Sequence, residues 1–160
     1  MNKAVEVARG YIGQTEKKGN AGFVDAEFEK EMRKVGFYTG APWCGFFARL
    51  VWKRAGGDWK LLKGSAVGTM MNATMVGNWH KAPEVGSIGV MRDFVKGKPQ
   101  RTGHIFIVVA FDDYHLTTIE GNTNRNGSRE GTEVLQKTRL IDWKEKNGKR
   151  LMGFIHFKAI

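Results

Sequence analysis

The amino-acid sequence predicts an α+β fold, with N-terminal helices packed on one side of a C-terminal antiparallel sheet of about five strands. Up to about residue 76, apolar residues recur at helical spacing between capping residues and glycines. After Pro83 the apolar residues form short runs separated by turn signals, which is typical of strands. A chain of 160 residues can bury a core as one domain, 1–160, and no repeat or linker divides it.

Two short helices are predicted first. The apolar stripe of the first helix consists of Val5, Ala8 and Ile12, and this helix ends near Gly13. The second begins after Asp25, whose side chain can cap the N-terminus, and ends at Gly36. Its apolar stripe consists of Phe28, Met32 and Val35.

Two further helices follow. Pro42 is typical of a helix start, and Gly56 and Gly57 end the helix that follows it. The pattern of this third helix consists of Phe47, Leu50, Val51 and Arg54. Ser65 opens a fourth helix that runs to about Val76. Its methionines, Met70, Met71 and Met75, are expected to fill the core.

Five strands are predicted in the second half, over residues 87–91, 104–111, 116–120, 132–138 and 151–157. A Gly/Asn-rich loop, 122–131, leads into the fourth strand. If residues 112–114 form a three-residue hairpin loop, counting back along both strands places residues 104, 106, 120 and 122 on one face. A four-residue loop would move Glu120 to the opposite face unless a bulge restores the register.

The net charge of +10 and the sequence pI near 9.9 predict attraction to polyanions. Nucleic acid is not favoured as the partner, because no single helix collects the basic residues and no zinc-finger, RRM-like or basic-zipper signature occurs. Bacterial cell-wall polymers and membrane surfaces are also anionic. The charge therefore indicates an acidic partner without choosing among these.

The place of synthesis follows from three features. One cysteine cannot form an internal disulfide, so stability does not depend on an oxidising compartment. Glu6 interrupts the N-terminal region where a secretory signal would be apolar, and the longest apolar run, 105–111, is far shorter than the ~18 residues of a membrane span. We expect synthesis in the cytoplasm without a signal peptide and no transmembrane segment.

Cys44 is the first candidate functional residue. It follows Pro42 and Trp43 at the start of the third predicted helix. Unpaired N–H groups and the positive end of the helix dipole favour a thiolate there, as a nucleophile requires. The alternative is a small buried apolar residue, which is the common role of a lone cysteine.

A thiolate nucleophile needs a histidine partner and a group that orients the imidazole. Of four histidines, His104 opens the most hydrophobic strand, and a strand positions a side chain rigidly. The hairpin count places Glu120 diagonally across from His104. A carboxylate there would orient the imidazole and stabilise its charged form. The alternative is a structural histidine beside an ordinary strand end.

Three motifs in this order resemble the CHAP family, the cysteine- and histidine-dependent amidohydrolases/peptidases. They are Pro42-Trp43-Cys44-Gly45-Phe46-Phe47, Gly103-His104-Ile105-Phe106-Ile107-Val108-Val109 and Ile119-Glu120-Gly121-Asn122. The resemblance implies a papain-like fold and hydrolysis of peptidoglycan amide bonds. It implies Cys44 as nucleophile, His104 as general base and acid, and Glu120 as the orienting group. Asn122 matches a polar residue that replaces or assists Glu120.

Further roles follow from the same resemblance. The Cys44 backbone N–H would stabilise the oxyanion, because it is unpaired at a helix start. The resemblance does not identify a second donor, for which Tyr38 and Trp43 are the candidates, and we expect both residues to contact the substrate. Some members of the family bind calcium through an Asp-rich loop before the cysteine. Residues 37–40 lack paired aspartates, so we expect no metal and no cofactor.

The function that the sequence predicts is cleavage of a wall-peptide amide, as an N-acetylmuramoyl-L-alanine amidase or a peptidoglycan endopeptidase. A phage endolysin or an injected antibacterial effector would act in the periplasm or on the cell wall, and an effector would have an immunity protein as partner. Two alternatives stay open. One is a metal site of Cys44, His104 and Glu120, although close ligand pairs are absent from the sequence. The other is a non-catalytic basic module that binds cell wall or nucleic acid.

Overall fold

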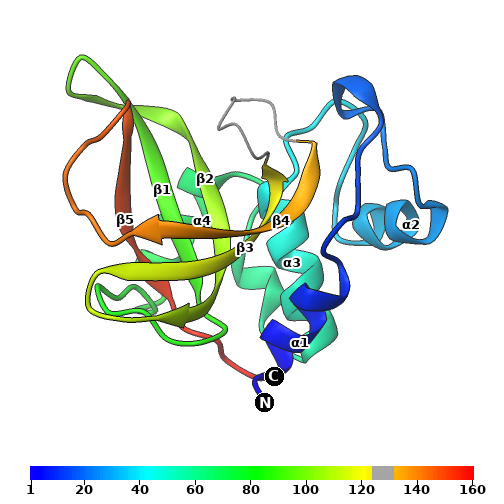
Figure 1. The fold of residues 1–160 in the computed structure, drawn as a ribbon, viewed down its shortest axis with the longest axis horizontal. Coiled ribbons are helices and arrows are strands. Elements are labelled where there is room, and N and C mark those ends of the chain that lie inside the picture. The colour runs from blue at the N-terminus through cyan, green and yellow to red at the C-terminus, as the bar shows by residue number, and fades with distance from the viewer. Residues whose placement is uncertain (124–131) are drawn as a thin grey trace.

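The fold is that of a computed structural model, which describes residues 1–123 and 132–160. The predicted α+β class is confirmed, because the helices come first and a five-stranded antiparallel sheet follows. Figure 1 shows α1, α2 and α3 on one side of the molecule and the strongly twisted sheet on the other. Most of the predicted loop 122–131 lies outside the described residues.

The helices within the described residues are α1 (Lys3–Gly10), α2 (Ala26–Lys34), α3 (Cys44–Ala55) and α4 (Ala66–Met75), with short 3-10 helices at Lys18–Asn20 and Trp59–Leu61. The predicted caps are confirmed. The Asp25 side chain accepts a hydrogen bond from the Phe28 N–H at 2.9 Å, and Ser65 accepts one from the Gly68 N–H at 3.1 Å. α3 ends at Gly56, whose positive φ of 80° gives the left-handed turn of a helix C-terminus.

Two predictions about buried helical residues are wrong. α1 ends at Gly10, so Ile12 lies beyond the stripe and is 44% exposed, while Tyr11 is buried instead. In α4 the buried residues are Ala66, Val67, Thr69 and Ala73. Because these mostly small residues bring α4 close to its neighbours, Met71 and Met75 face outward and are 60% and 84% exposed. Only Met70 packs against the core among the three methionines.

The strands are β1 (Ile88–Val95), β2 (Lys98–Phe111), β3 (His115–Thr123), β4 (Glu133–Leu140) and β5 (Lys149–Ile155). They lie in the order β4-β3-β2-β1-β5. β1 and β2 are longer than predicted because they meet in a tight hairpin at Lys96 and Gly97, whose φ angles are 49° and 73°. β2 therefore begins at Lys98, and His104 lies within the strand rather than at its start.

The two faces of the sheet bury different clusters. Ile105, Ile107 and Val109 belong to the main core, which the helices cover, whereas Phe106 and Val108 belong to a smaller cluster. Because adjacent residues of a strand point to opposite faces, the smaller cluster lies on the face away from α1 and α3. Leu116, Leu151 and Phe154 complete its buried part.

The β2–β3 hairpin determines which face Glu120 occupies. Phe111 pairs with Leu116, so the predicted three-residue loop is wrong and four residues separate the paired positions. A bulge between Val108 and Ala110 then shifts the register, and Ile107 pairs with Ile119. This register is the one obtained by counting from the three-residue loop, so Glu120 keeps its predicted face. None of the described helices has the length and apolarity needed to cross a bilayer.

Gly45 is expected to be indispensable for the position of α3. A Cβ atom on Gly45 would lie 2.4 Å from the Gly64 carbonyl oxygen and 2.6 Å from that of Lys63. Gly45→Ala must displace this backbone, and we expect a loss of about 1–3 kcal/mol in the free energy of unfolding, measured in urea. Gly10→Ala is the control, because a Cβ there meets no atom within 4 Å. Equal stability of the two variants would contradict the close packing of α3.

Candidate active site

Cys44 is the first residue of α3 and is 6% exposed. Its side chain belongs to the main core and also lines a groove, so the thiol is covered by protein yet open on one side. The first residue of a helix has no acceptor one turn earlier for its N–H. Among the described residues no acceptor is assigned to the Cys44 N–H, which is therefore placed to donate to a substrate oxygen.

His104 lies on β2 where the pairing with β3 has ended. β3 pairs with β2 only between Ile107 and the hairpin, while His104 pairs with Met91 on the β1 side. The edge of β2 at His104 is therefore not paired with β3, and the N-terminus of α3 approaches it. His104 and Cys44 interact there through their side chains, and the Ile105 backbone also bonds to the thiol.

Glu120 holds the imidazole of His104. His104 Nε2 lies 2.8 Å from Glu120 Oε1, and the Glu120 side chain is completely buried. Because this contact engages Nε2, Nδ1 is the ring nitrogen left for the thiol. The predicted diagonal contact is therefore present, and Cys44, His104 and Glu120 form one connected chain.

Arg139 and Thr118 complete the surroundings of Glu120. Arg139 donates from Nε to Oε2 at 2.5 Å and from Nη2 to Oε1 at 2.6 Å, and Thr118 Oγ1 donates to Oε2 at 2.6 Å. Two parallel hydrogen bonds from one guanidinium to a carboxylate hold both groups in a fixed plane. Arg139 also lies over the Phe106 ring, with 5.6 Å between its Cζ and the ring centroid.

Sequence reasoning missed Arg139. One signal was available, because alternate residues of a strand share a face and a buried carboxylate requires a cation. β4 pairs Arg139 with Leu116 and Leu135 with Glu120, so Arg139 shares the face of Glu120. The long arginine side chain spans the remaining distance along the strand.

The electrostatics favour an ion pair between Cys44 and His104. Burial by itself raises the pKa of the Cys44 thiol, but the hydrogen bond and charge of His104, with the backbone N–H groups of Ile105 and Gly45, lower that pKa below its usual value of 9.0. Burial lowers the pKa of His104, but Cys44 and Glu120 outweigh it and raise the pKa to about 9. Both shifts favour the thiolate–imidazolium pair over the neutral thiol and imidazole.

The charge on Glu120 is stabilised in the same way. Burial favours the neutral acid, but the hydrogen bonds and charges of Arg139 and His104 hold the pKa of Glu120 far below its usual value of 4.5. Burial lowers the pKa of Arg139, and Glu120 raises it above the usual value. The stable state of this site is therefore an ionised Glu120 carboxylate between the cations of His104 and Arg139.

The groove beside Cys44 has a volume of about 300 Å³. It is lined by Tyr38, Ala41, Pro42, Cys44, Phe46, Gly64, Ser65, Ala66, Arg101, Thr102 and Gly103. Tyr38 is 63% exposed and packs edge-on against Phe46, which suits the predicted substrate contact. The lining of the groove is mostly apolar and includes one arginine, Arg101.

Two predicted residues lie elsewhere. Trp43 is fully buried among Phe23, Phe28 and Phe47, and its indole N–H donates to Glu16 at 3.1 Å, so its side chain belongs to the core and not to the groove. Asn122 lies in the β3 bulge with a positive φ of 55°. Within the described residues it makes no hydrogen bond to His104, whose Nε2 contacts Glu120 instead.

No family model, curated protein or solved structure matches this chain. Its chemistry is therefore inferred from the residues of the site. Across residues 1–123 and 132–160, no three or more His, Cys, Asp or Glu side chains gather as a metal site. The geometry defines a class of site, a thiol activated by an imidazole that a buried carboxylate orients, which can perform nucleophilic catalysis at a carbonyl.

Arg139→Gln should destabilise the protein in a pH-dependent way. Because the pKa of Glu120 is depressed in the folded state, its contribution to stability is fully present above about pH 4.5 and declines as the pH falls from there toward the much lower folded-state pKa. We expect a loss of about 3 kcal/mol at pH 7, measured by urea unfolding, and a smaller loss at pH 3.

The matched control for Arg139→Gln is Arg54→Gln. Arg54 also lies 2.6 Å from a glutamate, Glu31, but its side chain is 54% exposed, so we expect about 1 kcal/mol or less. A loss for Arg139→Gln that equals this control, or that does not change between pH 7 and pH 3, would show that Arg139 does not stabilise the Glu120 carboxylate.

His104→Ala should slow alkylation of Cys44. At pH 6.5 an ordinary thiol is about 1% thiolate, whereas the imidazolium of His104 lowers the pKa of Cys44 and raises that fraction. We expect iodoacetamide to react at least about tenfold more slowly with the variant at pH 6.5, and the difference to shrink above pH 9. His115→Ala is the control, because His115 is half exposed and contacts Asp112. Equal rates for all three proteins would contradict an ion pair.

Proposed function

We propose that this protein is a cysteine hydrolase that cleaves an amide bond in the peptide part of peptidoglycan. The observation that carries the proposal is the connected chain of Cys44, His104 and Glu120, with the thiol at a helix N-terminus and open to a groove. A structural thiol needs none of these partners. Each of them has a defined task in amide hydrolysis.

In the first half of the reaction, the Cys44 thiolate attacks the carbonyl carbon of the scissile amide and forms a carbon–sulfur bond. The carbonyl oxygen becomes an oxyanion, which the Cys44 backbone N–H is placed to stabilise. The imidazolium of His104 then donates its Nδ1 proton to the amide nitrogen. The carbon–nitrogen bond breaks, the amine departs, and a thioester remains on Cys44.

In the second half, neutral His104 takes a proton from water, and the resulting hydroxide equivalent attacks the thioester carbon. The carbon–sulfur bond breaks, the acid product leaves, and thiolate and imidazolium are restored. Glu120 keeps the ring in one orientation through both halves. Arg139 is a positioning residue, because it fixes the Glu120 carboxylate and touches neither the thiol nor the groove.

Three further features support peptidoglycan as the substrate. The net charge of +10 would hold the protein on an anionic wall. The groove is mostly apolar, and Arg101 in its lining could pair with a substrate carboxylate. The order of the three motifs resembles the CHAP family, in which a papain-like arrangement performs this cleavage. The proposed place of action is the periplasm or the cell wall, after release as a phage lysin or injection as an effector.

Cys44→Ala should abolish the lysis of purified peptidoglycan sacculi while leaving the fold intact, because alanine replaces a small buried side chain. Turbidity loss measures lysis, and circular dichroism with urea unfolding checks the fold. His104→Ala should reduce the rate by at least about 10³-fold, and His115→Ala should leave it unchanged. Mass spectrometry of the digest identifies the cleaved amide. Full lysis by Cys44→Ala would refute the thiol mechanism, and wall binding without cleavage by the native protein would favour a basic binding module.

A further inference from the structure

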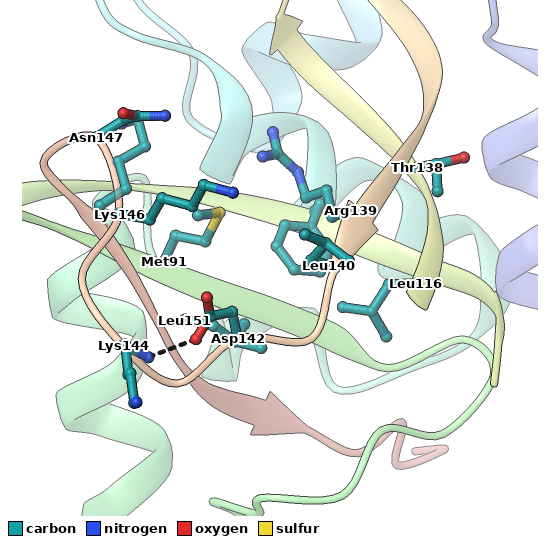
Figure 2. Close-up of a pocket in the computed structure, with 12 residues that line it drawn as sticks. Met91, Leu116, Thr138, Arg139, Leu140, Asp142, Lys144, Lys146, Asn147 and Leu151 are labelled. Atoms are coloured by element: carbon teal, nitrogen blue, oxygen red, sulfur yellow. Dashed lines mark hydrogen bonds between the residues drawn. The ribbon is translucent and has the colours of Figure 1, made fainter. Parts of the chain in front are cut away.

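A second cavity lies on the face of the sheet away from α1 and α3, where Arg139 of the candidate active site forms part of its lining. Its volume is about 360 Å³, and it extends between the sheet and the segment from β4 to β5. It is lined by Met91, Phe106, Leu116, Thr138, Arg139, Leu140, Asp142, Lys144, Lys146, Asn147, Lys149 and Leu151. Figure 2 shows how these side chains surround the space. This size lies within the range of small-ligand sites.

The floor of the cavity is apolar and rigid. Phe106, Leu116 and Leu151 belong to the smaller buried cluster of the sheet, and Met91 packs against it. Because these three side chains are almost completely covered, the apolar lining residues that offer accessible surface are the half-buried Met91 and the exposed Leu140. A ligand that covers Met91 and Leu140 with an apolar group would gain free energy by displacing water from them.

The mouth of the cavity is cationic. Four basic residues line it, Arg139, Lys144, Lys146 and Lys149, against the single carboxylate of Asp142. Asp142 accepts a hydrogen bond from the Lys144 backbone N–H at 3.0 Å, the dashed line in Figure 2. The Lys144 side chain points away from the other labelled residues, whereas Arg139 and Lys146 lie on the same side of the cavity.

Two of these cations already have partners. Lys149 bonds to Asp93 at 2.6 Å, and Arg139 bonds to Glu120 through Nε and Nη2. No described residue accepts a hydrogen bond from Arg139 Nη1 or forms an ion pair with Lys146. The bidentate contact with Glu120 immobilises the guanidinium, so its remaining donors are oriented before any ligand arrives, which lowers the entropy lost on binding.

We propose that this cavity binds an organic monocarboxylate, with the carboxylate at Arg139 and Lys146 and a short apolar group against Met91 and Leu140. A fully polar anion would leave these two apolar side chains uncovered, and a neutral apolar molecule would leave the cations without a counter-charge. The carboxylate can belong to a free aliphatic acid or to the C-terminus of a peptide. The binding does not depend on the proposed hydrolase activity.

The experiment is a titration of the full chain, followed by ¹H–¹⁵N NMR of the Phe106, Leu116 and Leu151 amides. Hexanoate and N-acetyl-leucine test the two sources of the carboxylate, and hexanamide and N-acetyl-leucinamide are their neutral counterparts. We expect at least one acid to shift these amides and to bind about tenfold or more tightly than its amide, because a charged hydrogen bond is lost. The acid that binds more tightly identifies the source.

Lys146→Gln should weaken binding of that acid about threefold to tenfold, and higher salt should weaken it further. Lys30→Gln is the matched control, because Lys30 is also an exposed lysine but lies on α2, outside the cavity. Equal binding of acid and amide, no shift with either acid, or the same affinity in both lysine variants would overturn the proposal. Because the readout is binding, loss of the proposed lytic activity would not alter this result.

Discussion

The whole site depends on one buried carboxylate. Glu120 is completely removed from solvent, and an ionised carboxylate in that position is unstable unless charged donors surround it. His104 and Arg139 supply those donors from β2 and β4, so the neighbouring strands β4, β3 and β2 are joined by one charged contact. The same contact that makes the buried charge tolerable also orients the imidazole toward Cys44.

Backbone irregularities create the space for this arrangement. The bulge between Val108 and Ala110 corrects the register of the hairpin, and the loss of β2–β3 pairing before Ile107 opens the β2 edge to α3. Gly45 then allows α3 to approach the 63–64 segment closely enough to fix the Cys44 backbone. A regular sheet and a helix with a larger second residue would not bring the sulfur and the ring together.

Arg139 belongs to two environments. One edge of its guanidinium holds Glu120 in the candidate active site, and the residue also lines the cavity on the far face of the sheet. The apolar ring of Phe106 lines the same cavity and packs against the guanidinium. A single side chain that neutralises the buried acid therefore also gives the second cavity its most rigid cation.

The pairing of Cys44 with His104 and Glu120 was predicted from the sequence, but the hairpin count placed Glu120 on the right face only because a bulge between Val108 and Ala110 restores the register. The sequence by itself determined the fold class and the helix starts at Asp25 and Ser65. Local chemistry controls these features, because caps, periodicity and turn residues act over a few positions. Only the tertiary structure decided that Trp43 is buried, that Met71 and Met75 are exposed, and that Arg139 reaches Glu120. These outcomes depend on how closely segments far apart in the sequence pack together. The order of residue types along the chain does not specify those distances.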